Sequence, residues 1–299
     1  MFVLIATIPP YVRHRYEIAT TPEVNELRFN TVMPVGESKL EVLENLREAC
    51  QGKKLWLDLK TRQLRITEFS YLPYAFVRLS HKIRVDLPAT IYFKDHKATV
   101  VEIVDGDKLI LEDRPHQIVG RGQPVNILDP SLEIEGFFTS DDLGFIEAAK
   151  QLGIHSYMLS FVEEERDILL MLEQDPEAEI IAKIESRKGL EFVKAIYPEY
   201  LGRVGLMAAR DDLYINMGED KLSMFEALAT IITADPQAIL ASRILTSLES
   251  SGDVALQDLS DLKYMMALGY HNFMLSDGIC FSKTAFRAVS QLIGQVINQ

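Results

Sequence analysis

Residues 180–189, IIAKIESRKG, combine an apolar strand with two charged side chains at its end. The apolar run is typical of a strand that is buried on both faces, and a glycine ends the stretch. Lys183 and Glu185 lie two residues apart, so in a strand their side chains point to the same face. The stretch therefore predicts a core strand that places a cation and a carboxylate side by side.

The same pattern of a short apolar strand and an amphipathic helix recurs along the chain. The expected helices are one with an apolar face at Leu40, Leu43 and Leu46, and others at 140–153, 163–174, 189–200 and 258–269. The strand candidates are 2–8, 25–31, 53–59, 156–161, 179–184, 203–210, 237–242 and 272–276. Strands that alternate with helices pair in parallel, and eight of them suit a closed barrel. The predicted fold class is α/β, a (β/α)₈ TIM barrel.

Residues 62–130 interrupt this alternation. The segment contains β-rich runs such as ATIYFKD, ATVVEIVDG and KLILED, separated by DG and GD turn signals, and has little helical pattern. We therefore expect a small inserted β-barrel domain at 62–130, with the (β/α)₈ barrel formed by 1–61 and 131–299.

Composition narrows the class of protein. The chain has 299 residues, 47% of them hydrophobic, and a formal net charge of -13, which argues against non-specific nucleic-acid binding. Only two cysteines occur, so we do not expect a disulfide framework. The low count is typical of a protein from a reducing compartment. The apolar start MFVLIATIPP is too short to span a bilayer, and no later stretch reaches 18 uncharged apolar residues. We expect a cytoplasmic protein without a membrane partner.

Polar side chains gather where the predicted strands end. They are Arg28, Asn30, Asp58, Lys60, Ser160, Lys183, Glu185, Arg210, Asp211, Asp212, Ser242 and Ser276. A single charge at a strand end is most often a solvated loop residue, but in a (β/α)₈ barrel the carboxyl ends of all strands converge on one face. Two carboxylates there would hold Mg²⁺ and leave positions for substrate oxygens. Neighbouring Lys and Arg side chains would neutralise a phosphoryl group.

Seven motifs, in order along the chain, resemble those of the pyruvate kinase family. They are ATIPP, LRFNTVM, LDLKTRQLR, IIAKIESRKGLE, GLMAARDDL, AILASRILTSL and FMLSDG. The match of IIAKIE is specific, and the others are looser. The insertion at 62–130 falls where that family carries a lid domain that closes over the nucleotide. The resemblance implies phosphoenolpyruvate or pyruvate and ADP or ATP as substrates, with Mg²⁺ or Mn²⁺ as cofactor.

The resemblance also implies roles for single residues. Lys183 would assist phosphoryl transfer and Arg28 would contact the phosphate, while Glu185 and Asp212 would be the metal ligands. Ser242 replaces a threonine near the enolate carbon and would help to position the water that protonates the enolate. The remaining implied site residues are Asn30 as a monovalent-cation ligand, Arg65 as a nucleotide contact, Asp58 and Lys60 from the LDLK motif, and Ser276 from FMLSDG.

The chain departs from the family pattern at several positions. Asp211 replaces the glycine of an Arg-Gly-Asp turn, which removes glycine's backbone freedom and adds negative charge where the family binds a carboxylate. A potassium site is not expected, because Val32 stands where the family has a serine ligand. The other departures are Leu59 for threonine, Gln63 for glutamate, and Gly278 for the glutamate after Ser-Gly. The C-terminal regulatory domain of the family is not expected in a chain that stops at Gln299.

Three functions remain open from the sequence. The first is a pyruvate kinase-like phosphotransferase, which would make the chain an enzyme. The second is a catalytically divergent or inactive relative that binds a ligand or a partner. The third is a Mg²⁺-dependent lyase or aldolase acting on pyruvate-like enolates, since fold alone does not separate these chemistries. A homo-oligomer is compatible with each of them.

Overall fold

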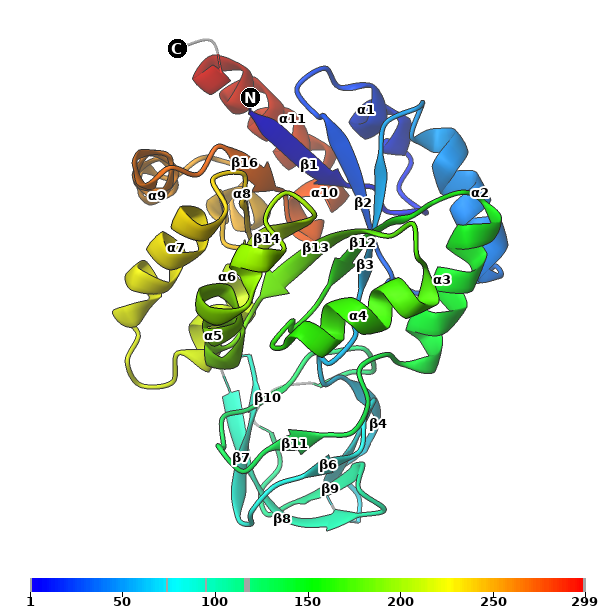
Figure 1. Cartoon of the computed structure of the whole chain (residues 1–299), viewed down its shortest axis with the longest axis vertical. Coiled ribbons are helices and arrows are strands. Elements are labelled where there is room, and N and C mark those ends of the chain that lie inside the picture. Colours follow the sequence, from blue (N-terminus) through cyan, green and yellow to red (C-terminus); the bar gives the residue numbers. More distant parts are fainter. Residues whose placement is uncertain (1, 74, 95, 116–118, 298–299) are drawn as a thin grey trace.

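The computed structural model describes residues 2–73, 75–94, 96–115 and 119–297 (Figure 1). Eight parallel strands close into a barrel in the order β1–β16–β15–β14–β13–β12–β3–β2. Their bounds are β1 (Val3–Thr7), β2 (Glu26–Asn30), β3 (Leu55–Leu59), β12 (Ser156–Leu159), β13 (Glu179–Ile184), β14 (Val204–Ala209), β15 (Ile239–Ala241) and β16 (Asn272–Met274). Each predicted strand coincides with one barrel strand, and the predicted fold class is confirmed.

Burial on both faces explains why the barrel strands are almost continuously apolar. In β13, Ala182 faces the helices, whereas Ile181 belongs to the cluster that fills the barrel interior. Lys183 continues the interior face, and Glu185 follows just after the strand ends. The alternation of a strand thus carries both charged side chains to the mouth of the barrel, at the carboxyl ends of its strands.

The interior of the barrel is filled by side chains from seven of its strands. They are Ile5, Trp56, Met158, Ile181, Met207, Ile239, Ala241 and Met274. A larger apolar cluster lies between the strands and the surrounding helices. The barrel interior is therefore a packed core, and the polar side chains that could form a site are those at its mouth.

Helices cover the outside of the barrel (Figure 1). They are α1 (Arg15–Thr20), α2 (Lys39–Ala49), α3 (Ser140–Gln151), α4 (Glu165–Gln174), α5 (Arg187–Ala195), α6 (Arg210–Asn216), α7 (Ser223–Ala234), α8 (Ser247–Ser250), α9 (Leu256–Leu268), α10 (Asp277–Phe281) and α11 (Lys283–Ile297), with a 3₁₀ turn η1 (Tyr197–Glu199). The sequence patterns predict α2, α3, α4, α5 and α9 but leave α1, α6, α7, α8, α10 and α11 unassigned. The isoleucines and threonines of α7 suit a strand as well as a helix, so local pattern does not decide its type.

The insertion leaves the barrel after β3 and returns before α3, and Asp142 joins the two ends. Its carboxylate accepts hydrogen bonds from the backbone N–H groups of Lys60 at 2.8 Å and Thr61 at 3.1 Å. The same carboxylate closes the capping box of α3 with Thr139. Because Asp142 is buried, this helix cap also ties the start of the insertion to the barrel.

The inserted segment forms its own β-structure below the barrel mouth in Figure 1. Its strands are β4 (Ile66–Ser70), β5 (Phe76–Leu79), β6 (Ile83–Arg84), β7 (Ala89–Phe93), β8 (His96–Val104), β9 (Lys108–Leu111), β10 (Asn126–Ile127) and β11 (Glu133–Ile134). Six of them form one sheet in the order β10–β7–β8–β9–β5–β4, a half-barrel around a separate apolar core, and β11 pairs with β6. Residues 62–130 remain our proposed extent of the inserted domain.

None of the helices in the described part of the chain combines the length and the apolar character that a bilayer crossing requires.

Candidate active site

A group of charged side chains, which we call the buried ion cluster, lies at the barrel mouth and consists of Arg28, Asp58, Lys60 and Lys183. Asp58, on β3, is completely buried and is the common partner of the three cations. Its Oδ2 accepts a hydrogen bond from Nε of Arg28 at 2.9 Å. Its Oδ1 lies 3.2 Å from Nζ of Lys60 and 3.3 Å from Nζ of Lys183. One carboxylate thus holds three cations at the centre of the site.

Charge pairing decides the protonation states in this cluster. Burial alone would raise the pKa of Asp58, but Lys183, Lys60 and Arg28 together hold it well below its usual range. Burial alone would lower the pKa of Lys183, but the carboxylates of Asp58 and Glu185 outweigh it and raise the pKa. For Lys60, burial outweighs the attraction of Asp58 and lowers the pKa to about 7. Lys183 therefore stays an ammonium group at neutral pH.

Lys183 connects the buried ion cluster to Glu185. Its Nζ donates to Oγ of Ser160 at 2.8 Å and lies 3.3 Å from Oε1 of Glu185. The other oxygen of Glu185 accepts from the backbone N–H of Phe161 at 2.8 Å. Burial, with a contribution from the negative charge of Asp212, raises the pKa of Glu185 to about 7. The two charges of the strand end therefore form an ion pair, in which Lys183 also contacts Asp58 and Ser160 and Glu185 also accepts from Phe161.

Asp212 lies in the first turn of α6 and contacts one residue near each end of the inserted segment. Its Oδ2 accepts from the side-chain amide of Gln63 at 2.7 Å, and its Oδ1 accepts from that of Asn126 at 3.0 Å. Arg65 reaches the same group indirectly, since its Nε donates to the amide oxygen of Gln63 at 3.0 Å. The amide nitrogen of Asn216, also on α6, donates to the amide oxygen of Asn126 at 2.9 Å. Asp212 thus joins the barrel to the inserted domain.

Comparison with known proteins supports the resemblance read from the motifs. The sequence pattern of the family described as pyruvate kinase, barrel domain, matches residues 48–283, most of the chain. This chain belongs to the pyruvate kinase family. A pyruvate kinase of Methanocaldococcus jannaschii is 25% identical over 309 aligned residues, which cover 97% of this chain and 67% of that relative.

Glu185 and Asp212 fit a magnesium ion as a pair of protein ligands. They come from the ends of neighbouring strands, β13 and β14, and each offers hard carboxylate oxygens. Asp212 raises the pKa of Glu185 because two carboxylates near each other repel. A divalent cation between them would offset this repulsion. No group of three or more His, Cys, Asp and Glu side chains with metal-binding geometry occurs among the described residues. Mg²⁺ held here would take its other ligands from water and substrate.

The residues that correspond to the family's potassium site do not fit a monovalent cation. The amide nitrogen of Asn30 donates to Oδ2 of Asp277 at 2.7 Å, so this side chain presents a donor to its neighbour. Asp58 is already surrounded by three cations, and Val32 offers no side-chain oxygen. The positive charge next to Asp58 comes from the chain's own side chains.

The Arg210-Asp211-Asp212 turn tolerates the aspartate that replaces the family's glycine. Residues 210–212 open helix α6, and Asp211 is absent from the residues with positive φ, so its backbone does not need glycine. The side chain of Asp211 is half exposed and pairs with Nε of Arg243 at 2.7 Å. The extra negative charge thus points to the rim, where a neighbouring cation compensates it.

Ser242 and Ser276 lie at the barrel mouth but outside the buried ion cluster. Ser242 has a φ of 64°, and its backbone carbonyl accepts from Nε of Arg210 at 3.0 Å. Ser276 caps helix α10 and donates its hydroxyl hydrogen to Glu249. The carboxyl group of Glu249 also fills the space beside Gly278, since a Cβ there would lie 2.6 Å from its Cδ. The side chain of Glu249, from α8, thus closes the space next to Gly278.

Three further residues take part in the site without having been assigned to it from the sequence. Asp277 forms an ion pair with Arg28, and Gln63 and Asn126 bind Asp212. The signal for Asp277 is present in the FMLSDG motif, where it stands between Ser276 and Gly278. Nothing in the sequence singles out Asn126, because its partner lies 86 residues further along the chain.

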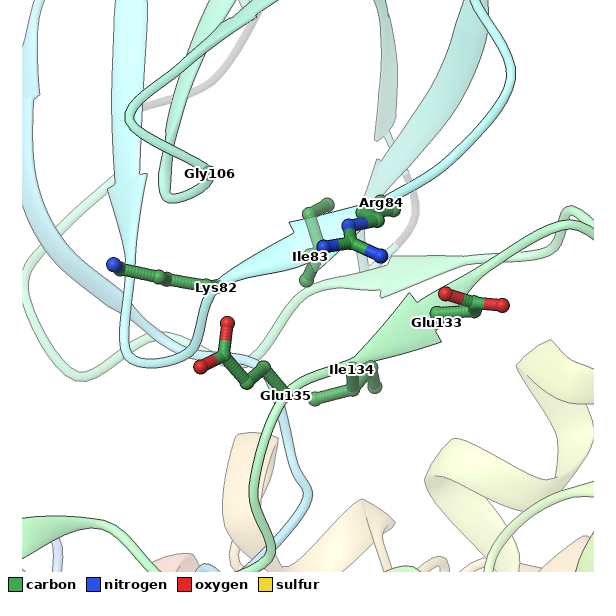
Figure 2. A pocket seen from close by; sticks show the side chains of 7 residues that line it. All are labelled: Lys82, Ile83, Arg84, Gly106, Glu133, Ile134 and Glu135. Atoms are coloured by element: carbon green, nitrogen blue, oxygen red, sulfur yellow. The ribbon is translucent and has the colours of Figure 1, made fainter.

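Two hollows lie near or within the inserted domain. One of about 1000 Å³ is lined by both the insertion and the barrel, including Asn126, Ser186 and Asn216. The other, of about 440 Å³, lies beside the β6–β11 ribbon and is shown in Figure 2. Its lining contains side chains of both charges, and Arg84 and Glu133 are register partners in the antiparallel β6–β11 pair. The second hollow shares no residue with the buried ion cluster.

Proposed function

We propose that the chain is a phosphotransferase that moves a phosphoryl group between phosphoenolpyruvate and ADP. The observation that carries this proposal is the buried ion cluster, in which Lys183 and Arg28 are held by Asp58 beside two candidate metal ligands. A reaction that passes through a highly charged phosphoryl group needs fixed cations in a dry site more than it needs covalent chemistry.

Each residue of the site has a proposed task. Lys183 keeps its proton and neutralises the phosphoryl group in transfer, while Ser160 and Asp58 hold its ammonium group in place. Arg28 binds the phosphate of the substrate. Glu185 and Asp212 hold Mg²⁺ or Mn²⁺, which when bound supplies positive charge to the substrate oxygens. Arg65 contacts the nucleotide, and Ser242 positions the water that protonates the enolate. Lys60, Asn30 and Ser276 contribute further polar groups to the mouth.

The inserted domain would act as the lid of this site. Gln63 and Asn126, which stand at its two connections to the barrel, both bind Asp212. A lid attached in this way closes over the side of the mouth that holds the two candidate metal ligands. Exclusion of water by such a closure strengthens every charge interaction with the substrate.

A coupled pyruvate-release assay with phosphoenolpyruvate, ADP and Mg²⁺ tests the proposal. Lys183→Met should lower kcat by about 100-fold or more, because it removes a fixed charge from the transferring group. Lys194→Met is the matched control, since Lys194 is exposed on α5 and forms a surface ion pair with Glu191. Turnover that persists in Lys183→Met would refute the assignment. Potassium is expected to have no effect on the rate.

A second candidate is a member of the family that binds a ligand without turning it over. The observation that favours it is the commitment of the site's own groups to each other: Asp277 is paired with Arg28, and both oxygens of Asp212 accept hydrogen bonds. Titration calorimetry with oxalate and Mg²⁺ separates the two candidates. Binding without turnover supports the second, and turnover refutes it.

The setting of the protein is also a proposal. We propose a cytoplasmic protein without nucleic acid or membrane as partner, and the net charge of -13 and the family membership support this. Exposed apolar side chains on and beside α7 and α9 (Leu222, Phe225, Leu256 and Tyr264) support a homo-oligomer. Sedimentation of the protein at two concentrations would test this assembly.

A further inference from the structure

We propose that Asp277 acts as a built-in anion that occupies the phosphate-binding side of Arg28, so that a phosphate ligand binds only after displacing it. The inference rests on the proposed function in taking Arg28 as the phosphate contact. It goes beyond that function by assigning to Asp277 control over which anions the site accepts and how tightly.

The carboxylate of Asp277 is bound as a ligand anion would be. Arg28 forms an ion pair with it through Nη1, and the amide nitrogen of Asn30 donates to its Oδ2 at 2.7 Å. The hydroxyl of Thr7 also donates to its Oδ1, at 3.2 Å. A guanidinium, an amide and a hydroxyl converge on one carboxylate, as donors do in sites for phosphate and carboxylate ligands.

Arg28 has little capacity left for a second anion while Asp277 is in place. A guanidinium has five N–H donors. Nε and Nη2 donate to Asp58, and Nη1 contacts both Thr7, at 3.0 Å, and Asp277. Four donors are therefore engaged, and a phosphate would meet one free donor together with the negative charge of Asp277.

Asp277 is not needed to hold Arg28 in position. Asp58 is completely buried and contacts two nitrogens of the guanidinium, while Thr7 fixes a third. Asp277 lies on the solvent side of this group, with its side chain about a third exposed (33%). A carboxylate that is reached from solvent, and whose partner is fixed without it, can move away when another anion arrives.

The place of Asp277 in the chain allows such a movement. It is the first residue of α10, a helix of five residues that follows β16 through the cap residue Ser276. Gly278 follows, and the carboxyl group of Glu249 lies beside it. Ile279 and Cys280 anchor the helix because both are completely buried, whereas the partly exposed side chain of Asp277 can turn away without a shift of a barrel strand.

The test is titration calorimetry of the full chain with inorganic phosphate, comparing the wild type with Asp277→Asn. The variant keeps the size of the side chain and removes its charge. Phosphate should bind at least about tenfold more tightly, which corresponds to about 1.4 kcal/mol. Asp277→Ala should show the same gain, and thermal unfolding of each variant checks that it is folded.

Two controls locate the effect. Asp141→Asn changes the net charge equally at a side chain that is 80% exposed on α3, and it should leave phosphate binding unchanged. Combining Arg28→Gln with Asp277→Asn should abolish the gain, because the released donor is then absent. Equal gains in Asp277→Asn and Asp141→Asn, or a gain that survives loss of Arg28, would overturn the proposal.

The binding result is independent of turnover. Suppose that Asp277→Asn binds phosphate more tightly but the wild type releases no pyruvate in the coupled assay. This result would support the displaced-anion inference and contradict the phosphotransferase proposal. The inference would be overturned if Asp277→Asn bound phosphate as tightly as the wild type or more weakly, whatever the enzyme assay shows. It would also be overturned if neither protein bound phosphate detectably.

Discussion

The two halves of the barrel mouth hold their charged side chains in different ways. The half formed by β2, β3, β12 and β13 contains the buried ion cluster, where charges sit on strand ends and pair with one buried carboxylate. The half formed by β14, β15, β16 and β1 continues into short helices and a loop. Ser242, Arg243 and Leu245 in that loop have positive φ, and Arg210 holds the carbonyl groups of the first two.

This difference has a physical consequence for substitutions. In the first half, a lost partner leaves a buried charge unpaired, which is among the most costly defects in a protein. In the second half, most partners are backbone carbonyls or exposed carboxylates that water can solvate instead. The same kind of substitution should therefore cost more in the first half than in the second.

The largest effect is expected from Asp58→Ala. The substitution leaves Lys60 and Lys183 buried without their common counter-ion, so the free energy of unfolding should fall by about 3–5 kcal/mol. Urea unfolding followed by circular dichroism measures it. Asp141→Asn, at an exposed ion pair, should change the same quantity by less than about 1 kcal/mol. Equal effects in the two variants would remove the distinction between buried and rim charges.

Arg210→Ala should have the largest effect in the second half. Arg210 is buried and binds the carbonyl groups of Ser242 and Arg243 as well as both oxygens of Asp261. Its removal should lower the free energy of unfolding by about 2–3 kcal/mol, less than Asp58→Ala, because Asp261 is partly exposed and can be hydrated. Hydrogen exchange should speed up at the backbone of residues 243–246. A loss larger than that of Asp58→Ala would reverse the comparison.

Two glycines offer a smaller, matched test of packing. A Cβ at Gly189, in α5, would lie 2.9 Å from the backbone carbonyl oxygen of Val162, which cannot move freely. Gly189→Ala should therefore cost about 1–3 kcal/mol of stability. At Gly278, in α10, the neighbour is the flexible carboxyl group of Glu249, and alanine is the better helix former, so Gly278→Ala should change stability by less than about 1 kcal/mol. Thermal unfolding of both variants measures the difference, and a larger loss at Gly278 would contradict it.

The smallest effect is expected for the pair formed by Asp211 and Arg243. Their side chains are 52% and 40% exposed, so the coupling energy from a double-mutant cycle with Asp211→Ala and Arg243→Ala should stay below about 1 kcal/mol. It should decrease further in 0.5 M salt, because exposed charges are screened. A coupling energy of several kcal/mol would contradict the comparison, because this exposed pair would then be as strong as a buried one.

Local pattern was sufficient to predict the barrel and much of the first half of its mouth. Lys183 and Glu185 follow Ile181 on one face of a strand, and strand ends meet at one mouth, so sequence spacing alone brings them together. The helix α7 escaped this reasoning because its isoleucines and threonines favour a strand as much as a helix. The effect of Asp211 was expected to be unfavourable, but the helical backbone at that position accommodates it.

The sequence by itself determined the eight alternating strands, the inserted β-segment and the identity of the residues at the strand ends, because these follow from periodicity within a few residues. Only the tertiary structure decided which of them pair. Arg28 and Asp277 are 249 positions apart, Gln63 and Asp212 are 149 apart, and each contact arises from closure of the barrel and the return of the chain from the insertion. A partner at such a distance leaves no trace in local spacing, since it depends on where the whole barrel brings its ends together.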